Sequence, residues 1–383
     1  MVCADPMTGR CSLCGKQSRY IAGNLSLCVD CIRTDPHRSV PFIRDAHRKA
    51  RERFGLPAQP PRSRRGIPCA VCSQECRIGE DEVGYCGLRR NIDGRLDSNV
   101  STEKALLYAY LDPQVTNCCA AWFCPAGTGA GYPKYAYCEG PERGYYNLAV
   151  FFYGCNFDCL FCQNISHKQL ELAEETTADQ LVRTTIKNDR ISCWCFFGGS
   201  PEPQLPFAIT ASREMLKALP SGRIVRICFE WNGCGNRFLV ERAAEIALEN
   251  GGNLKFDLKC FDPTLSLALS GTENSSAYAN FKAVYDRFYN ERRDLPVLTA
   301  TTLLVPGYTD SEEVDRIARF IAGLDTSIPY SLLVFFPHFM MSDLPPTPLE
   351  QVQECYRAAK RHLKRVNLGN LNLLGGNRFK ISA

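Results

Sequence analysis

Residues 151–164 have the sequence FFYGCNFDCLFCQN, which places cysteines at positions 155, 159 and 162 directly behind an apolar run. A structural zinc ion normally takes four ligands, and a disulfide takes two thiols. Three thiols on one tight loop suit a metal centre that keeps one coordination position open. Because thiolates are the ligands of iron–sulfur clusters, we predict that Cys155, Cys159 and Cys162 hold a cluster with one iron left for a substrate or cofactor. A zinc site completed by a remote fourth ligand is the alternative.

The composition describes a globular chain that is rich in thiols. Its 383 residues are 45% hydrophobic and 22% charged, and 22 of them are cysteine. This length accommodates two or three domains. No apolar stretch approaches the roughly 18 to 20 residues of a membrane span, and the N-terminus lacks a signal-peptide core, so we expect a cytoplasmic protein. Disulfide frameworks are typical of short secreted domains. The clustered thiols are therefore interpreted as metal ligands, and oxygen-labile clusters would suit an anaerobic host.

From residue 146 onward, short apolar runs alternate with helix-length amphipathic segments. Strands are expected at 148–153, 191–197, 224–230, 254–258, 297–304 and 330–336. Helices are expected at 177–187, 209–219, 237–249, 275–289, 311–323 and 349–366. Such alternation indicates βαβ units and a parallel sheet. We therefore predict an α/β fold, a (βα)6 partial TIM-type barrel preceded by a cysteine-rich metal-binding region. The G-x-G-x-x-G dinucleotide fingerprint is absent after the first strand, which disfavours a Rossmann oxidoreductase.

The N-terminal third is expected to form separate modules. Residues 1–35 are predicted to be a zinc-ribbon or rubredoxin-like module, 36–65 a basic linker and helix, 66–145 a cysteine-rich accessory region, and 146–383 the barrel. Two C-x2-C pairs in the first module supply four sulfur ligands, at Cys11, Cys14, Cys28 and Cys31. Two such pairs converge on a tetrahedral site in zinc ribbons. Zinc is favoured over a mononuclear iron, and a structural role over a catalytic one.

Two further groups of cysteines lie in the accessory region. The first group, interpreted as a second metal or an auxiliary iron–sulfur cluster, comprises Cys69, Cys72, Cys76 and Cys86. The second group lies in a segment rich in glycine and proline, which indicates a loop covering another part of the protein; it comprises Cys118, Cys119, Cys124 and Cys138. Cys118 and Cys124 are candidate metal ligands, with buried or free thiols as the alternative.

The segment 33–65 is strongly basic, with ten lysines or arginines against three acids. A basic run beside a cysteine module can contact RNA or an acidic partner. The simpler interpretation, a solvated helix followed by a linker rich in proline and arginine, is favoured.

The three-cysteine loop follows the first expected barrel strand, and function in parallel α/β folds gathers at the carboxyl ends of strands. The C-x3-C-x2-C spacing, with Phe161 before the last cysteine, resembles the signature of radical S-adenosylmethionine enzymes. The resemblance implies that the three cysteines ligate three irons of a [4Fe–4S] cluster and that S-adenosylmethionine chelates the fourth. One electron then cleaves the cofactor to a 5′-deoxyadenosyl radical, which abstracts hydrogen from the substrate. Phe161 would pack on the adenine.

Motifs at the later strand ends extend this resemblance. The segment FFGGSPEP (196–203) resembles the family's Gly-Gly-Glu motif, with Ser200 at the glutamate position and Glu202 two residues later. The remaining matches are FEWNGCGN (229–236), KFDLKCFDP (255–263), TTLLVPGYTDS (301–311) and VFFPHFMMSDLPPTP (334–348). The cofactor-binding residues implied by these matches are Gly198, Gly199, Glu202, Glu230, Asn232, Asp257, Lys259 and His338.

The D-x-K pair and the order of the motifs are similar to the pyruvate formate-lyase activating-enzyme-like branch. The leader of residues 69–91 resembles that of the uncharacterised AmmeMemo-type radical SAM proteins. The resemblance implies hydrogen abstraction from a protein or other bulky substrate and a one-electron donor such as ferredoxin or flavodoxin. The alternative is an RNA-binding or RNA-modifying protein that uses the zinc module and the basic segment, so nucleic acid is the less favoured partner.

Overall fold

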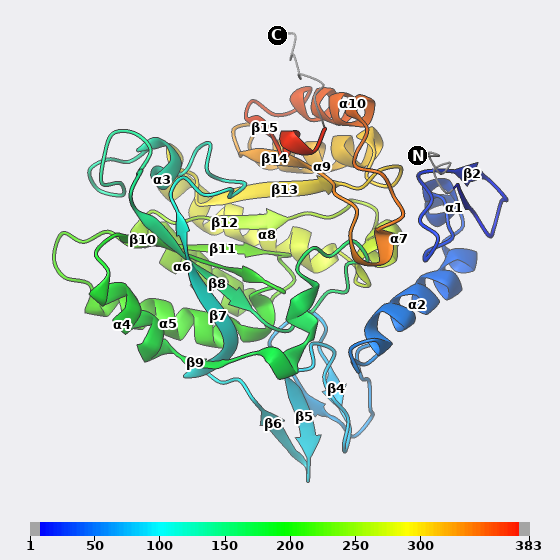
Figure 1. The fold of residues 1–383 in the computed structure, drawn as a ribbon, viewed down its shortest axis with the longest axis horizontal. Coiled ribbons are helices and arrows are strands. Elements are labelled where there is room, and N and C mark those ends of the chain that lie inside the picture. The colour runs from blue at the N-terminus through cyan, green and yellow to red at the C-terminus, as the bar shows by residue number, and fades with distance from the viewer. Residues whose placement is uncertain (1–7, 375–383) are drawn as a thin grey trace, which may run out of the picture.

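The computed structural model describes residues 8–374 and has a curved nine-stranded sheet at its centre (Figure 1). The strand order is β15-β14-β13-β12-β11-β10-β8-β7-β9. The strands of this sheet are β7 (Lys104–Pro113), β8 (Tyr146–Phe152), β9 (Glu175–Thr177), β10 (Ile191–Gly198), β11 (Arg226–Trp231), β12 (Leu254–Asp257), β13 (Leu298–Leu304), β14 (Tyr330–Val334) and β15 (Val366–Gly369).

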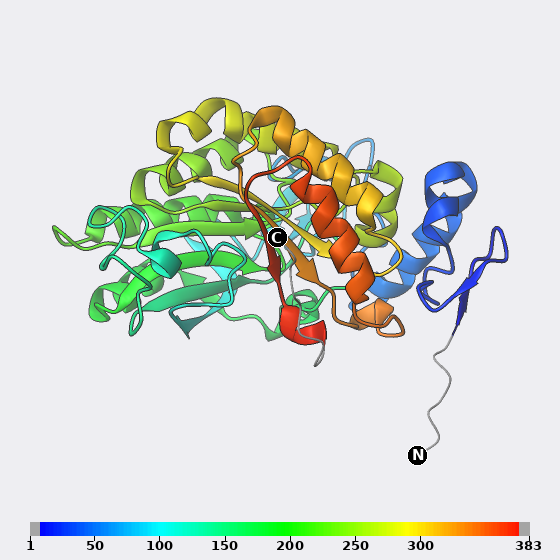
Figure 2. The ribbon, with the colours of Figure 1, turned by 90° about the horizontal axis from the view of Figure 1, so that it is seen from above.

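Helices connect the parallel strands and cover the outer face of the sheet (Figure 2). The helices of the outer face are α4 (Ala178–Lys187), α5 (Leu205–Ala218), α6 (Arg237–Asn250), α8 (Ser275–Phe288), α9 (Ser311–Leu324) and α10 (Leu349–Lys360). Helix α7 (Pro263–Ser270) lies in the same connection as α8 but packs on the N-terminal part of the chain. The strands β8, β10, β11, β12, β13, β14 and β15 pair in parallel, in chain order. The prediction of a (βα)6 partial barrel is thus confirmed. The last helix ends earlier than expected because residues 366–369 add a seventh parallel strand.

The hydrophobic pattern explains why these segments pack as they do. Every residue of β8 after Tyr146 is buried, as expected for a parallel strand covered on both faces. Trp194 and Phe196 on β10 belong to the same apolar core as the helices of the outer face. Side chains alternate along a strand. The residues next to them, Cys193, Cys195 and Phe197, therefore point to the barrel interior.

Strand β7 was not expected from the sequence. It pairs antiparallel with β8, so that Tyr108 lies opposite Phe151 and Tyr110 opposite Ala149. The strand lies inside the segment 66–145, which the sequence predicted to be an accessory region. The parallel strands of the barrel thus continue into an antiparallel edge that this segment provides.

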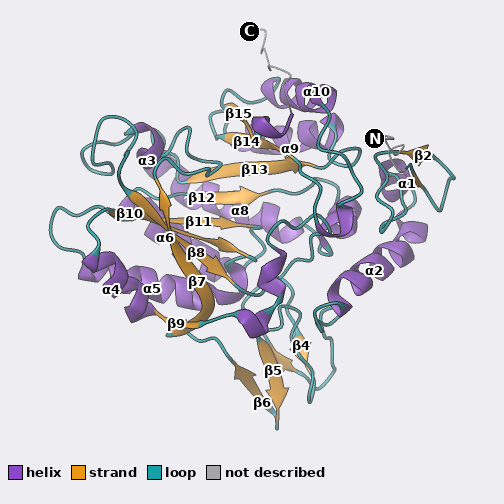
Figure 3. Ribbon diagram, viewed as in Figure 1, coloured by secondary structure: helices purple, strands orange, loops and turns teal. Residues whose placement is uncertain are grey.

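The remainder of the accessory region forms small hairpins and a short helix. Figure 3 shows β4, β5 and β6 extending away from the main sheet. The elements of this part are β3 (Ile67–Pro68), β4 (Arg77–Ile78), β5 (Arg89–Ile92), β6 (Arg95–Ser98) and α3 (Pro125–Thr128).

The N-terminal module lies at one edge of the barrel, beside α7 (Figures 1 and 2). Its elements are β1 (Gly9–Arg10), β2 (Gln17–Ser18), α1 (Val29–Thr34) and α2 (Pro36–Glu52). Leu27 and Ile32 share an apolar cluster with Leu265 and Tyr308 of the barrel. The module is therefore packed on the barrel through a core of its own. Across residues 8–374, no helix combines the length and apolarity that a membrane crossing requires.

Candidate active site at the strand ends

A cavity of about 240 Å³ lies at the carboxyl ends of the parallel strands. It brings together ten of the residues predicted from the sequence: Cys155, Cys159, Phe161, Cys162, Gly198, Gly199, Glu230, Asn232, Asp257 and Lys259. They come from the ends of β10, β11 and β12 and from the segments that follow β8 and β12. Residues that are up to about one hundred positions apart in the sequence thus form one wall.

The three thiols of this cavity lie in a largely dry environment. Burial raises the pKa of Cys162 to about 11, and it also raises the pKa values of Cys155 and Cys159. Cys155 Sγ donates a hydrogen bond to the carbonyl of Gly199 at 3.3 Å. Without a metal these thiols stay protonated at neutral pH, whereas iron stabilises the thiolate form. The donor set therefore fits an iron–sulfur cluster.

The two glycines at the end of β10 are required by the close packing of the cysteine loop. A Cβ atom on Gly199 would lie 2.3 Å from the carbonyl oxygen of Gly154. Gly198 has a φ of +114°, a conformation that residues with a side chain rarely adopt. The glycine pair thus lets the end of β10 approach the backbone that carries the three thiols.

Asp257 and Lys259 form an ion pair on the cavity wall. Lys259 Nζ donates to Asp257 Oδ2, and Asp257 Oδ1 is buried without a partner. Burial raises the pKa of Asp257 although Lys259 opposes this effect. A buried acceptor without a donor is costly, so Oδ1 suits an amino group of a bound ligand. This site therefore fits the methionine part of S-adenosylmethionine.

Glu202 does not line the cavity, in contrast to its predicted role. Its side chain is fully buried, and its Oε1 accepts the backbone N–H of Gly233 at 2.7 Å. Burial raises the pKa of Glu202 to about 7. The carboxyl group thus braces the turn after β11. Ser200 lines the cavity instead, and its Oγ accepts from Asn232 Nδ2 at 3.0 Å.

His338 also lies outside the cavity lining. It precedes a short 3-10 helix, Phe339–Met341, in the segment after β14. The role predicted for it near the cofactor's ribose has no support in this geometry.

Asp158 is a site residue that the sequence analysis missed. It lies between Cys155 and Cys159 and is completely buried. Its carboxylate pairs with Lys168 and accepts from His47 Nδ1 at 2.7 Å, with Arg51 Nη1 at 3.7 Å. Burial alone would raise the pKa of Asp158, but Lys168 and His47 outweigh it and hold the pKa below its ordinary value. The cysteine loop is thus fixed to helix α2.

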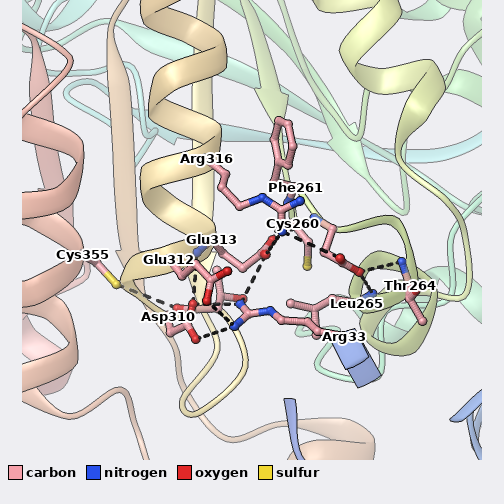
Figure 4. Close-up of polar contacts among 12 residues, drawn as sticks. Arg33, Cys260, Phe261, Thr264, Leu265, Asp310, Glu312, Glu313, Arg316 and Cys355 are labelled. Carbon is pink, nitrogen blue, oxygen red and sulfur yellow. Dashed lines mark hydrogen bonds and ion pairs between the residues drawn. The ribbon is translucent and has the colours of Figure 1, made fainter. Parts of the chain in front are cut away.

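A second ionic contact joins the N-terminal module to the barrel (Figure 4). Arg33 binds both oxygens of Asp310 at 2.9 Å each and lies 3.3 Å from Glu313. Glu313 in turn accepts the backbone N–H groups of Phe261 and Asp262. Arg33 and Arg51, two of the basic residues of the segment 33–65, are therefore engaged by acids of the barrel.

The N-terminal cysteines converge as their spacing predicts. The sulfurs of Cys11, Cys14, Cys28 and Cys31 all lie within 4.8 Å of one another. Four sulfurs at this separation suit one tetrahedral ion. The first group of the accessory region lines one small cavity of about 10 Å³, and its members are Cys69, Cys72, Cys76 and Cys86. In the described part of the chain, no three of these four sulfurs lie within 4.8 Å of one another, so the choice between a single ion and a cluster stays a prediction.

Comparison with known proteins agrees with this site. The model of the radical SAM superfamily matches residues 149–321. The uncharacterised protein MJ0808 of Methanocaldococcus jannaschii is 25% identical over 319 residues, which cover 80% of this chain and 81% of that protein.

Two solved structures illustrate the structural likeness. Streptococcus suis SuiB bound to the precursor peptide SuiA is 14% identical, with a TM-score of 0.43 over 58% of this chain; the match spans about half of SuiB, 47%. A domain of pyruvate-formate lyase-activating enzyme from Bacteroides vulgatus is 18% identical, with a TM-score of 0.34 over 46% of this chain and 98% of that domain. By the family model, the chain contains a radical SAM domain over residues 149–321, and enzymes of this superfamily use a [4Fe–4S] cluster and S-adenosylmethionine.

Proposed function

We propose that Cys155, Cys159 and Cys162 hold the [4Fe–4S] cluster, and that the enzyme abstracts hydrogen from a protein or another bulky substrate. The observation that carries the first part is the convergence of three thiols, a buried carboxylate and an ammonium group on one cavity. When bound, the cluster and S-adenosylmethionine supply a 5′-deoxyadenosyl radical.

The residues of the cavity have distinct roles in this proposal. Asp257 accepts a hydrogen bond from the amino group of the cofactor, and Lys259 supplies a positive charge for its carboxylate. Lys259 Nζ lies 5.6 Å from the ring centre of Phe161, so the methionine and adenine sites would be adjacent. The backbone of Gly198 and Gly199 forms the wall next to Cys155.

An aromatic surface supports the assignment of a bulky substrate. Tyr108 and Tyr110 on β7 expose 39% and 44% of their surface. Tyr108 stacks on Phe151 with ring centres 4.7 Å apart, and Tyr110 meets Phe197 edge-on at 6.4 Å. Phe197 lines the cavity. This half-exposed strip leads from the surface to the cavity, and large apolar surfaces of this kind mark interaction sites.

The cluster assignment is tested on reduced protein purified without oxygen. We would quantify 5′-deoxyadenosine formed from S-adenosylmethionine, together with bound iron and sulfide. Cys159→Ala should abolish cofactor cleavage and lower iron, whereas Cys355→Ala, which removes a buried thiol on α10 away from the cavity, should leave both unchanged. Cleavage at the parental rate in Cys159→Ala would refute the assignment.

The substrate class is tested by deuterium transfer. Extract from the native host grown on deuterated medium would be divided by dialysis, and each fraction would be incubated with enzyme and unlabelled cofactor. We expect deuterium in 5′-deoxyadenosine with the retained macromolecular fraction, and less of it for Tyr110→Ala. Transfer from the dialysed small molecules alone would contradict a bulky substrate. Loss of the signal after ribonuclease, but not after protease, would identify RNA as the substrate instead.

A further inference from the structure

A second cavity lies beside the first in the barrel and is lined by five thiols. Its volume is about 250 Å³, and we call it the thiol chamber. Its cysteines are Cys118, Cys124, Cys193, Cys195 and Cys228. Phe197 and Glu230 line both the thiol chamber and the strand-end cavity. These two side chains thus lie between the thiol chamber and the strand-end cavity.

The thiols of the chamber come from three distant segments. Cys193 and Cys195 are two residues apart on β10 and face the same side of the sheet. Cys228 on β11 is the direct neighbour of Cys195 across the two strands. Cys118 and Cys124 belong to the segment between β7 and β8. Cysteines that are isolated in the sequence therefore meet in the folded chain.

Buried cations face the sulfurs of this chamber. Lys255 is 1% exposed, and its Nζ lies 3.0 Å from Cys118 Sγ and 3.1 Å from Cys195 Sγ. Arg226, also 1% exposed, donates from Nε to Cys193 Sγ at 3.2 Å. A buried cation is costly unless an anion compensates it. Carboxylates already compensate these two cations, Glu230 at 3.1 Å from Lys255 Nζ and Glu142 paired with Arg226, and the sulfurs accept further hydrogen bonds from them.

We propose that the thiol chamber holds a further metal centre, an iron–sulfur cluster ligated by four of its five cysteines. Cysteine thiolates are the usual ligands of such clusters, and a cluster with four thiolates is anionic. Lys255 and Arg226 would hydrogen-bond to its sulfurs, an arrangement that tunes cluster potentials. The chamber is also far larger than a single ion requires.

A mononuclear ion fits the chamber less well. Cys118, Cys119 and Glu230 do place ligand atoms within 4.8 Å of one another. However, Glu230 already pairs with Lys255 Nζ at 3.1 Å, and this group offers two thiols where the chamber offers five. Cys119 receives a hydrogen bond from Thr301 Oγ1 at 3.2 Å instead of lining the chamber. The centre is therefore assigned to the five thiols that line the cavity.

The test uses the full chain with the loop thiols removed, Cys155→Ala, Cys159→Ala and Cys162→Ala together. In this background we would compare the double variant Cys195→Ala/Cys228→Ala, called the chamber variant, with the control Cys355→Ala. Iron, sulfide and zinc per chain would be measured in both after anaerobic purification. The chamber variant should lose about two to four irons, and as many sulfides, per chain relative to the control. Equal iron in both variants would overturn the proposal, and loss of zinc without sulfide would overturn the iron–sulfur assignment.

A second variant leaves every chamber thiol in place. Lys255→Met removes the positive charge that favours the reduced, more anionic state of the cluster. In a redox titration followed by electron paramagnetic resonance, the midpoint potential of the remaining cluster should become more negative, with its iron retained. An unchanged potential would overturn the placement beside Lys255. Because the background lacks the loop thiols, neither result depends on whether the enzyme cleaves S-adenosylmethionine.

Discussion

The buried carboxylate of Asp158 should contribute strongly to the attachment of the cysteine loop to helix α2. Asp158→Asn keeps the shape of the side chain but removes the charge that faces Lys168, His47 and Arg51. A unit pair about 4 Å apart interacts with roughly 4 kcal/mol at an effective dielectric constant near 20. Breaking one side of a buried pair costs about 3–5 kcal/mol, because the partner charge stays buried. We therefore expect a loss of that size.

This loss is a large part of the stability of an ordinary domain, which amounts to about 5–15 kcal/mol. We would measure the free energy of unfolding in urea and, because a chain of several modules need not unfold in one step, also the hydrogen exchange of the amides in α2. Exchange in α2 should accelerate in Asp158→Asn. The matched control is Asp45→Asn on the exposed side of α2, where Asp45 pairs with Arg48 and Lys49; it should leave both measurements nearly unchanged.

The same carboxylate should also make stability depend on pH. Since the pKa of Asp158 is lower in the folded chain than its ordinary value of 3.8, its contribution is present above that value and declines as the pH falls further. The parent should therefore lose free energy of unfolding below about pH 4 more steeply than Asp158→Asn. A difference between the two proteins below about 1 kcal/mol at neutral pH, the value of an exposed pair, would refute this account.

Three further predictions concern metal and cofactor binding. Cys11→Ser should release about one metal ion per chain, since a tetrahedral site then lacks a ligand. An unchanged metal content would contradict a metal site at these cysteines. Gly199→Ala should disturb the cysteine loop at a cost of about 1–3 kcal/mol, because its Cβ would lie 2.3 Å from Gly154 O; full iron content and an unchanged Tm would contradict this. Lys259→Ala should weaken binding of S-adenosylmethionine in calorimetry more than it lowers iron content, and equal losses would indicate a structural lysine.

The barrel could be predicted from the sequence because its strands and helices carry strong, separate periodicities. Buried parallel strands appear as apolar runs, and the helices between them as amphipathic segments. Strand β7 was not predicted, because the segment that contains it was assigned from its cysteines alone. The strand also pairs antiparallel at the edge of the sheet, outside the alternation of strands and helices. Its KALLYAYLDP sequence (104–113), with Tyr108 and Tyr110 on one face, carries the β-propensity that could have revealed it.

The candidate site could be predicted where a motif fixes the spacing of residues on one loop. It could not be predicted where residues from separate strands and turns pack together. The spacing of Cys155, Cys159 and Cys162 places three thiols together in any fold. By contrast, the burial of Glu202 depends on how the turn after β11 packs. The convergence of Cys195 and Cys228 depends on strand register, which no local pattern specifies.

Helices α1 and α2 each hold a part of the barrel near the candidate site. His47 and Arg51 on α2 hold the cysteine loop through Asp158, while Arg33 on α1 holds the start of α9 through Asp310 and Glu313. Helix α1 begins after Cys28 and contains Cys31, the last of the four converging cysteines, and α2 follows α1. An ion bound by those sulfurs would fix the start of α1 and thereby favour the orientation of the groups on α2. A metal in the N-terminal module would thus stabilise the loop that carries Cys155, Cys159 and Cys162.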